Sequence, residues 1–373
     1  MRVGIVGCGK VADQHACQIR RIVGAELVAA CDTEPLMARQ ICERFSIPRR
    51  FSALPTMLGE AGLDVVHLTT PPQTHFELAR LCLNAGVHVY IEKPFTVDTV
   101  QAEELIRLAT KNGLKLTVGH NTKFTHAMIR MRRLVSEGYL GGKPLHVEST
   151  YGYDLGDEGY AKAFLGDRQH WIRTLPGSLL QNIVSHGIGR IAEFLTGTPL
   201  VSAQGFTSPF LRRIGEPDLI DELRVVIRDQ DSTTAYFTFS SQIRPIIHQL
   251  RLYGSRHSLI VDDDHQSVIE LDGSEYKSYL RYFYAPLCFA RQYVNASRTN
   301  VMRFAKREFH LPFDAGLKTL IEMFYRSIRY DTPLPVSYRE ILLTSKIMDD
   351  TFAQLNSRHT STPGTPAALA LRA

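Results

Sequence analysis

The sequence predicts an α/β protein in which a doubly wound parallel sheet is followed by a second α/β domain with a mostly antiparallel sheet. Its 373 residues suit about two domains. Apolar runs alternate with amphipathic stretches up to Phe124, and strands of period-two alternation dominate later. We therefore expect domains at 1–124 and 125–356, then a disordered tail at 357–373.

The first domain is predicted from nearly all-apolar strands that alternate with amphipathic helices. Two of these helices, at 74–86 and 99–113, each end in a glycine, as helices often do. The expected strands are 2–6, 26–31, 64–69, 87–91 and 114–119. Such strands are typical of a parallel sheet that is covered on both faces.

The second domain is predicted from consecutive strands that are joined by short polar turns. Helices are expected at about 126–137 and 179–195, with a strand near 145–153 between them. The later strands are expected at 223–229, 233–240, 247–254, 257–263 and 267–271. Two helical patterns, at 314–330 and 339–356, close the domain.

Composition narrows the range of functions. A formal charge of +5 suits an anionic ligand but does not argue for nucleic acid. The six cysteines form no CxxC pair, which favours reduced thiols in a cytoplasmic protein and no metal site. No apolar run reaches the roughly 18 residues of a membrane span, and the chain opens directly on a strand, which leaves no room for a signal peptide.

A glycine motif follows the first strand. Gly7 and Gly9 begin the pattern GxGxxA, in which Gly7 permits a tight turn and Gly9 lets a pyrophosphate approach the backbone. Lys10 and Val11 open the next helix, whose N-terminus favours negative charge. Asp32 ends the second strand, where it can accept hydrogen bonds from a ribose and repel a 2′-phosphate. The motif predicts a Rossmann domain that binds NAD rather than NADP. The alternative interpretation is that Gly7 and Gly9 are ordinary turn residues and that Asp32 caps a helix.

The chain resembles the Gfo/Idh/MocA oxidoreductase family. The resemblance rests on five collinear motifs: GIVGCGKVADQH (4–15), TTPPQTH (69–75), AGVHVYIEKP (85–94), VGHNTKF (118–124) and YRSIRYDTPLPVSYREIL (325–342). It implies a nicotinamide held between a Rossmann domain and a C-terminal domain whose open sheet makes dimer or tetramer contacts.

The resemblance also implies roles for single residues. Lys93 would bond both the cofactor ribose and a substrate hydroxyl, with a cis Lys93–Pro94 peptide. Thr70, Pro71 and His75 would lie along the dinucleotide. Asn121, in the fourth motif, is a weaker candidate for substrate contact.

Lys93 and Glu92 end a buried strand, where doubly wound proteins place ligands. An ammonium at this position can stabilise a developing alkoxide, and Glu92 can pair with it or with the ribose. A surface salt bridge at a strand end is the alternative interpretation.

A dehydrogenase also needs a base. The family pattern of an Asp followed four residues later by a His is only partly matched: His186 stands at the histidine, but Asn182 replaces the aspartate. On a helix these two share a face opposite Val184 and Ile188, which predicts that they point toward the cleft. We assign His186 as the base and Asn182 as an orienting group, against the alternative of an ordinary polar helix residue.

Two further segments remain open at this point. In the loop 153–177, Arg168 and the single tryptophan, Trp171, could meet a sugar-like or anionic substrate, or could form a packed rim. The basic, aromatic segment 276–310 could be an interfacial membrane helix, although packing on the protein or a second subunit is favoured. Pro286 argues against one continuous helix there.

These features together predict an NAD-dependent dehydrogenase. Its expected substrate is a secondary alcohol or ketone of a sugar, cyclitol or nucleotide-linked sugar. Two alternatives stay open because Asn182 breaks the family motif. One is an enzyme that uses NAD transiently in a non-redox hydrolysis or elimination, and the other is a catalytically silent cofactor-binding regulator.

Overall fold

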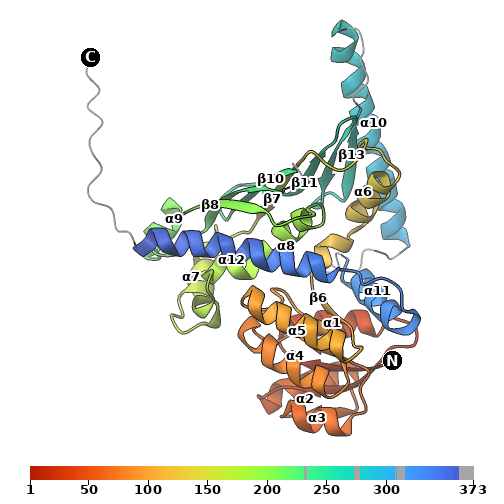
Figure 1. The fold of residues 1–373 in the computed structure, drawn as a ribbon, viewed down its shortest axis with the longest axis vertical. Helices are drawn as coiled ribbons and strands as arrows, with labels where there is room; N and C mark the ends of the chain where they lie inside the picture. The colour runs from red at the N-terminus through yellow and green to blue at the C-terminus, as the bar shows by residue number, and fades with distance from the viewer. Residues whose placement is uncertain (231–232, 273–277, 307, 309–315, 361–373) are drawn as a thin grey trace.

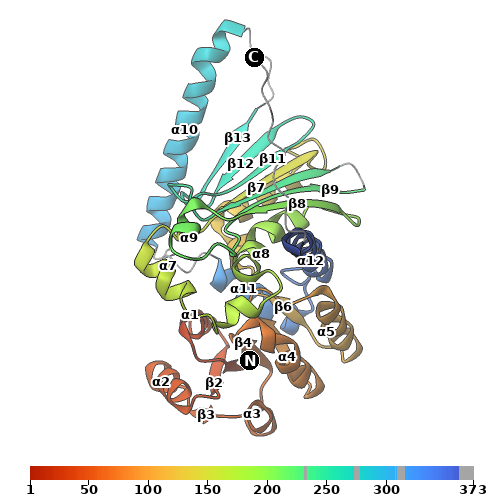
Figure 2. The ribbon, with the colours of Figure 1, turned by 90° about the vertical axis from the view of Figure 1, so that its left-hand side faces the viewer.

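The computed structural model describes residues 1–230, 233–272, 278–306, 308 and 316–360. It contains a six-stranded sheet of order β3-β2-β1-β4-β5-β6 and a seven-stranded sheet of order β13-β12-β11-β7-β10-β9-β8. The first sheet lies in the N-terminal domain and the second forms the opposite end of the molecule (Figures 1 and 2). The predicted fold class is confirmed.

The first sheet is entirely parallel and has the expected strands. They are β1 (Arg2–Val6), β2 (Glu26–Cys31), β4 (Val65–Leu68), β5 (His88–Ile91) and β6 (Leu116–Val118). The sixth, β3 (Arg49–Phe51), escaped prediction because its three residues include two arginines and form the sheet edge. The covering helices are α1 (Lys10–Ile19), α2 (Pro35–Phe45), α3 (Leu54–Glu60), α4 (His75–Asn84) and α5 (Thr99–Lys111). Strand order reverses between β1 and β4, so a crevice opens at their carboxyl ends.

The second sheet is antiparallel except where β7 (His146–Gly152) pairs with β10 (Thr234–Ser240). Its other strands are β8 (Leu200–Phe206), β9 (Glu222–Arg228), β11 (His248–Tyr253), β12 (Ser258–Asp262) and β13 (Ser267–Leu271). β8 was not predicted, because its mixed sequence LVSAQGF lacks a clear alternation. The remaining helices of this region are α6 (His126–Ser136), α7 (Glu158–Leu165), α8 (Ser178–Ala192) and α9 (Pro209–Arg213).

The helix α8 packs directly on this sheet. A Cβ at Gly187 would lie 2.2 Å from the ring of Phe237 on β10, so the glycine sets how closely helix and sheet approach. Ser149 of β7 donates a hydrogen bond to the Gly187 carbonyl (3.1 Å). The other face of the sheet is open, and Val226 and Tyr236 on it are each 50% exposed.

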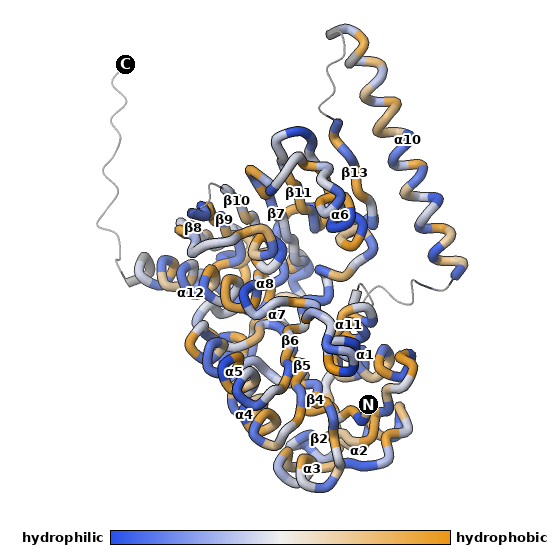
Figure 3. The backbone as a smooth tube through the Cα atoms, turned by 45° about the vertical axis from the view of Figure 1, so that its right-hand side comes forward, coloured by the Kyte–Doolittle hydropathy of each residue, from blue (hydrophilic) through white to orange (hydrophobic). Residues whose placement is uncertain are grey.

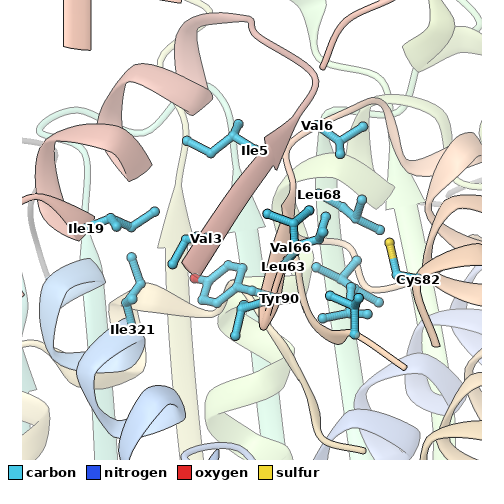
Figure 4. Packing of buried hydrophobic residues seen from close by; sticks show 14 of the residues in the cluster. Val3, Ile5, Val6, Ile19, Leu63, Val66, Leu68, Cys82, Tyr90 and Ile321 are labelled. Atoms are coloured by element: carbon cyan, nitrogen blue, oxygen red, sulfur yellow. The ribbon is translucent and has the colours of Figure 1, made fainter. Parts of the chain in front are cut away.

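The chain returns to the first domain near its end. α11 (Leu317–Tyr330) contributes Leu317, Ile321 and Phe324 to the core of the Rossmann domain. Figure 4 shows Ile321 beside Ile19 and near Tyr90. The predicted division at Phe124 assigned this helix to the second domain, but burying its apolar face against α1 places it with the first. α12 (Tyr338–Thr360) then crosses between the domains and contacts α5, α8 and β8.

The described part of the basic, aromatic segment 276–310 forms α10 (Ser278–Ala305), a single helix of 28 residues. The expectation that Pro286 would interrupt it is wrong, since the helix continues through the proline. It lies along the edge of the molecule beside β13, its main neighbour (Figures 1 and 2). The tail predicted at 357–373 begins too early, because α12 continues to Thr360; residues 361–373 lie outside the described part of the chain.

The structure also bears on the expectations for the cysteines and for membrane-spanning helices. No disulfide joins any of the six cysteines, all of which lie within the described ranges. Burial and the neighbouring Asp32 carboxylate raise the pKa of the Cys8 thiol to about 12, which keeps it protonated. In the part of the chain that is described, we find no helix with both the length and the apolar character to cross a bilayer.

A candidate active site between the two domains

The dinucleotide end of the site is built by the turn between β1 and α1. Gly7 has φ +86°, and a Cβ there would lie 2.6 Å from Cγ2 of Thr70, so only glycine fits. A Cβ on Gly9 would meet nothing within 4 Å. The first turn of α1 carries no side-chain cap, and Val11 in it is 38% exposed. A helix N-terminus without a side-chain cap, beside the open space over Gly9, is what a pyrophosphate requires.

Asp32 is fixed at the end of β2 by the same turn. Its Oδ2 accepts a hydrogen bond from the Cys8 backbone N–H (2.6 Å), and its Oδ1 accepts one from the Glu34 N–H (2.9 Å). Each carboxylate oxygen keeps a further lone pair for a ribose hydroxyl. The cradle over Gly9 and the oriented Asp32 therefore fit NAD, which supplies a hydride acceptor when it is bound.

The loop after β4 supports this end of the site. Thr70 Oγ1 accepts a hydrogen bond from the Thr74 hydroxyl (2.7 Å), and Pro71 is exposed. His75 does not lie along the crevice as expected, because its side chain is fully buried. Its Nε2 lies 2.9 Å from the Thr70 carbonyl and its Nδ1 lies 3.0 Å from the Pro94 carbonyl. His75 therefore ties the Thr70 loop to the Lys93–Pro94 turn.

Lys93 crosses from the first domain to the second. Its peptide bond to Pro94 is cis, and its Nζ donates to the Asn182 carbonyl (2.9 Å) and faces the Asn182 Oδ1 (3.3 Å). Burial lowers the pKa of Lys93, while the nearby Glu92 charge raises it, and the net direction is down.

Of the two partners expected for Glu92, the Lys93 ammonium or the ribose, the ammonium is bonded to Asn182 instead, and Glu92 Oε2 accepts a hydrogen bond from the Lys93 backbone N–H (3.1 Å). Its Oε1 lies 2.9 Å from Nε2 of His15. Burial alone would raise the pKa of Glu92, but the bond from His15 and the charge of Lys93 bring it below its usual value. Glu92 is therefore an anion held beneath the lysine.

A buried chain of side chains continues from Glu92. His15 Nδ1 lies 2.8 Å from Nδ1 of His67, and His67 Nε2 lies 2.8 Å from the hydroxyl of Tyr325. Burial lowers the pKa of His67 well below its usual value, so its ring is neutral. Because the Glu92 carboxylate can only accept, His15 donates to it from Nε2, and the three contacts link Tyr325 to Glu92 through the His67 and His15 rings. Sequence reasoning missed this chain because its members are far apart and only a shared core brings them together.

The structure brings His186 to the same place as Lys93. His186 is one turn beyond Asn182 on α8 and is 8% exposed. Its Nδ1 lies 3.4 Å from the Thr122 hydroxyl, and its ring stacks on Tyr151 with centroids 5.8 Å apart. Burial, and then the charge of Lys93, lower the pKa of His186 well below its usual value. The imidazole is thus neutral near neutral pH, which is the form that a general base must have.

The simple two-faced helix that the sequence predicted for α8 is not observed. Nearly every residue from Leu179 to Ala192 is buried, because the sheet covers one side and α12 and the η2 turn (Asn121–Phe124) cover the other. A Cβ on Gly189 would lie 3.1 Å from the ring of His120, so the imidazole occupies the space beside this glycine. Burial lowers the pKa of His120 to about 3. His120 and Thr122 were both missed, since no spacing relates them to α8.

A buried ion cluster holds this side of the site in place. Lys123 Nζ lies 3.4 Å from Glu193 and also contacts Glu340, while Arg132 donates to Glu193 (2.8 Å). Burial would raise the pKa of Glu193, but Lys123 and Arg132 lower it to about 2. The cluster joins η2, α6, α8 and α12, and so fixes α8 against the turn that carries Thr122.

The weaker substrate candidates lie at the rim. Trp171 begins the short η3 turn (Trp171–Thr174), and its carbonyl accepts a hydrogen bond from Gln73 (2.7 Å), which places this loop against the Thr70–Thr74 loop. Arg168 is exposed. Asn121 starts η2, one residue before the Thr122 that faces His186. None of these three is brought to the Lys93 ammonium by a described contact.

Comparison with known proteins agrees with this geometry. Residues 1–120 match the model of the oxidoreductase family with an NAD-binding Rossmann fold. A UDP-N-acetylglucosamine 3-dehydrogenase of Acidithiobacillus ferrooxidans is 35% identical over 37% of this chain and 42% of its own length. An inositol 2-dehydrogenase of Rhizobium meliloti is 22% identical over 73% of this chain and 78% of its own length. The first curated relatives are matched over only 36% to 48% of their own lengths.

Solved structures share the whole fold. The WlbA dehydrogenase from Bordetella pertussis, solved with NADH and UDP-GlcNAcA, covers 96% of both chains with a TM-score of 0.75 and 18% identity. An NAD-binding oxidoreductase from Klebsiella pneumoniae gives a TM-score of 0.76 over 96% of this chain and 97% of its own, with 19% identity. At these identities the likeness establishes the two-domain architecture.

Proposed function

We propose, from the premise that residues 1–120 belong to the Gfo/Idh/MocA oxidoreductase family, that this protein is an NAD-dependent dehydrogenase acting on a secondary alcohol. The observation that carries the proposal is the bond from Lys93 to Asn182, which joins the cofactor-binding domain to the helix that bears His186. A cation and a neutral imidazole then lie at one domain boundary, beside a turn that fits a dinucleotide. A cofactor-binding regulator without catalytic activity would need neither the cation nor the imidazole at this boundary.

The proposed chemistry divides between the two side chains. His186 removes the hydroxyl proton, and we assign this role to Nε2 because Nδ1 faces Thr122. Lys93 stabilises the alkoxide that develops on the same oxygen. Asn182 positions the ammonium through its carbonyl and holds no proton in the pH range of the reaction.

For the substrate we propose a sugar, a cyclitol or a nucleotide-linked sugar. Relatives matched by this chain are named for UDP-N-acetylglucosamine, inositol and D-glucosides. Trp171, at the rim, supplies an aromatic face that suits a sugar ring. We extend the proposal to a cytoplasmic protein, in keeping with its six reduced thiols.

The test is a screen of NAD with UDP-N-acetylglucosamine, its uronate, myo-inositol and simple glucosides, followed by absorbance of NADH. We expect one class to give turnover that Lys93→Ala and His186→Ala abolish. Binding of NAD with no turnover on any class would favour the regulator. A tightly held NAD with a product of unchanged oxidation state would favour the non-redox enzyme.

The open face of the second sheet supports a second proposal, that copies of the chain associate through it. Leu200 and Phe206 on β8 and Val226 and Tyr236 on neighbouring strands are each at least 50% exposed. Light scattering should report a dimer or tetramer that Val226→Glu with Tyr236→Glu dissociates. An unchanged molar mass would overturn it.

A further inference from the structure

The helix α10 has two faces, and one of them holds it to the protein. Residues Ala285, Phe289, Gln292, Ala296, Asn300 and Arg303 recur every three or four positions and are, with Cys288, its least exposed described residues. Gln292 donates to the Glu270 carbonyl (3.0 Å) and accepts from the Glu270 N–H (2.7 Å), so it occupies the free edge of β13. Asn300 donates to the His265 carbonyl (2.9 Å). These bonds fix how the helix is rotated about its axis.

The opposite face is apolar and directed away from the protein. Eleven large apolar or aromatic side chains of α10 are at least 45% exposed. Phe283, Leu287, Val294 and Val301 form its centre, since they are spaced by four or seven residues, and each is 54–70% exposed. Figure 3 shows hydrophobic positions along the whole of this outlying helix. Such a stripe is the reverse of an ordinary surface helix, whose apolar side faces the core.

The charge of α10 has one sign. From Ser278 to Lys306 the sequence contains Arg281, Arg291, Arg298, Arg303 and Lys306 and no Asp or Glu. Arg303 lies on the inner side, 3.9 Å from Glu308. Arg291 and Arg298 both lie along one side of the apolar stripe, and neither forms a salt bridge within the described part of the chain.

We propose that α10 binds the surface of an anionic lipid bilayer, lying in the plane of the headgroups. An apolar stripe with arginines along one side, on a helix roughly 42 Å long, matches the pattern of interfacial helices. Anionic headgroups supply the negative charge that the helix lacks, while acyl chains receive Phe283, Leu287, Val294 and Val301. Two α10 helices packed on each other would instead bring arginines together with no carboxylate from either helix.

The placement of α10 suits a flat surface. The helix lies at the periphery in two perpendicular views, and its inner face is the one bonded to β13 (Figures 1 and 2). Lys93 follows β5 and His186 lies on α8, whereas the main neighbour of α10 is β13. Membrane binding would therefore hold the enzyme at a lipid surface without covering the proposed active site.

The experiment is flotation of the full chain with phosphatidylcholine vesicles, with and without phosphatidylglycerol. We expect binding only to the anionic vesicles, and loss of binding at high salt. Arg291→Glu with Arg298→Glu should lower partitioning by at least roughly 30-fold, since each arginine contributes about a factor of five near a charged surface. Leu287→Glu with Val294→Glu should lower it by at least about 100-fold.

The matched control is Val23→Glu with Val100→Glu, which adds the same charges at exposed valines of the Rossmann domain. It should bind vesicles like the parent. Light scattering without lipid tests a second copy as the occupant. The proposal is overturned if Leu287→Glu with Val294→Glu changes the molar mass in solution, or if the parent chain does not float with anionic vesicles.

Discussion

The two ends of the proposed active site are built in different ways. At the cofactor end, Gly7, Gly9 and Asp32 come from one strand–helix–strand unit and are held by short local bonds such as Cys8 N–H to Asp32. At the substrate end, Lys93, Thr122 and His186 come from three elements. A substitution at the cofactor end alters only local contacts. A substitution at the substrate end also alters the contact between the two domains.

This difference explains which half carries departures from the family pattern. The cofactor end must fit an invariant dinucleotide, and its geometry allows little choice of residue at Gly7. At the substrate end, Asn182 stands where the resemblance implies an acid, and the His120 ring lies beside Gly189. The surrounding ion cluster of Lys123, Glu193 and Glu340 holds α8 in place without help from an acid at position 182.

The largest expected effect is at the substrate end. His186→Ala and Lys93→Ala should each lower turnover by roughly 10²–10⁴, the usual contribution of an acid–base or charge-stabilising group. The NAD dissociation constant should stay close to that of the parent, because the dinucleotide is held mainly at the β1–α1 turn. Steady-state rates and calorimetric titration with NAD measure the two quantities separately.

A suitable control is His265→Ala, which removes an exposed histidine from the turn between β12 and β13. Its rate should equal that of the parent. A large loss of NAD affinity in His186→Ala would mean that the two ends are not separable, and the comparison above would fail.

The next largest effect is expected at the cofactor end, where Gly9→Ala is compared with Gly7→Ala. Gly9→Ala should leave the free energy of unfolding nearly unchanged, because its Cβ meets open space, yet should weaken NAD binding by roughly 10- to 100-fold through lost backbone bonds. Gly7→Ala should destabilise the fold itself by about 1–3 kcal/mol, since φ is +86° and Thr70 blocks the Cβ. Denaturant unfolding and NAD titration of both variants check this contrast. Equal unfolding curves for the two variants would contradict it.

A smaller effect is expected at Asp32. Asp32→Ala should narrow the preference for NAD over NADP by roughly tenfold or more, because it removes an acceptor for the 2′-hydroxyl and a charge that repels a phosphate. Binding constants for both cofactors measure the ratio. If the parent already binds NADP as tightly as NAD, the role given to Asp32 is wrong.

Sequence patterns predicted the elements that depend on neighbouring residues. They missed the features that depend on contacts between distant segments. β1 and β2 were predicted to the residue because apolar runs end at glycine or aspartate, and so was the short β13. β3 and β8 were missed because they are edge strands, where burial no longer imposes a pattern. The chain from Tyr325 through His67 and His15 to Glu92 could not be predicted, because it depends on α11 packing on the first domain. Pro286 was misjudged because an exposed helix tolerates a proline whose cost the rest of its 28 residues offset.

The smallest predicted effect is that of Asn182→Asp, a substitution at the substrate end that should shift the pH dependence of catalysis. A carboxylate one turn from His186 stabilises the imidazolium, so the pKa of His186 should rise. His186 acts as a base only when neutral, so kcat/KM falls as pH drops through this pKa, and the acid limb of the profile should move to higher pH. In the parent, burial and Lys93 lower the pKa of His186, so its acid limb should lie below the ordinary histidine value of 6.5. Asn182→Leu, of similar size and without charge, is the control and should leave the limb in place. An acid limb that stays fixed in Asn182→Asp would show that His186 is not the titrating base, and the regulator would then become the better account of this chain.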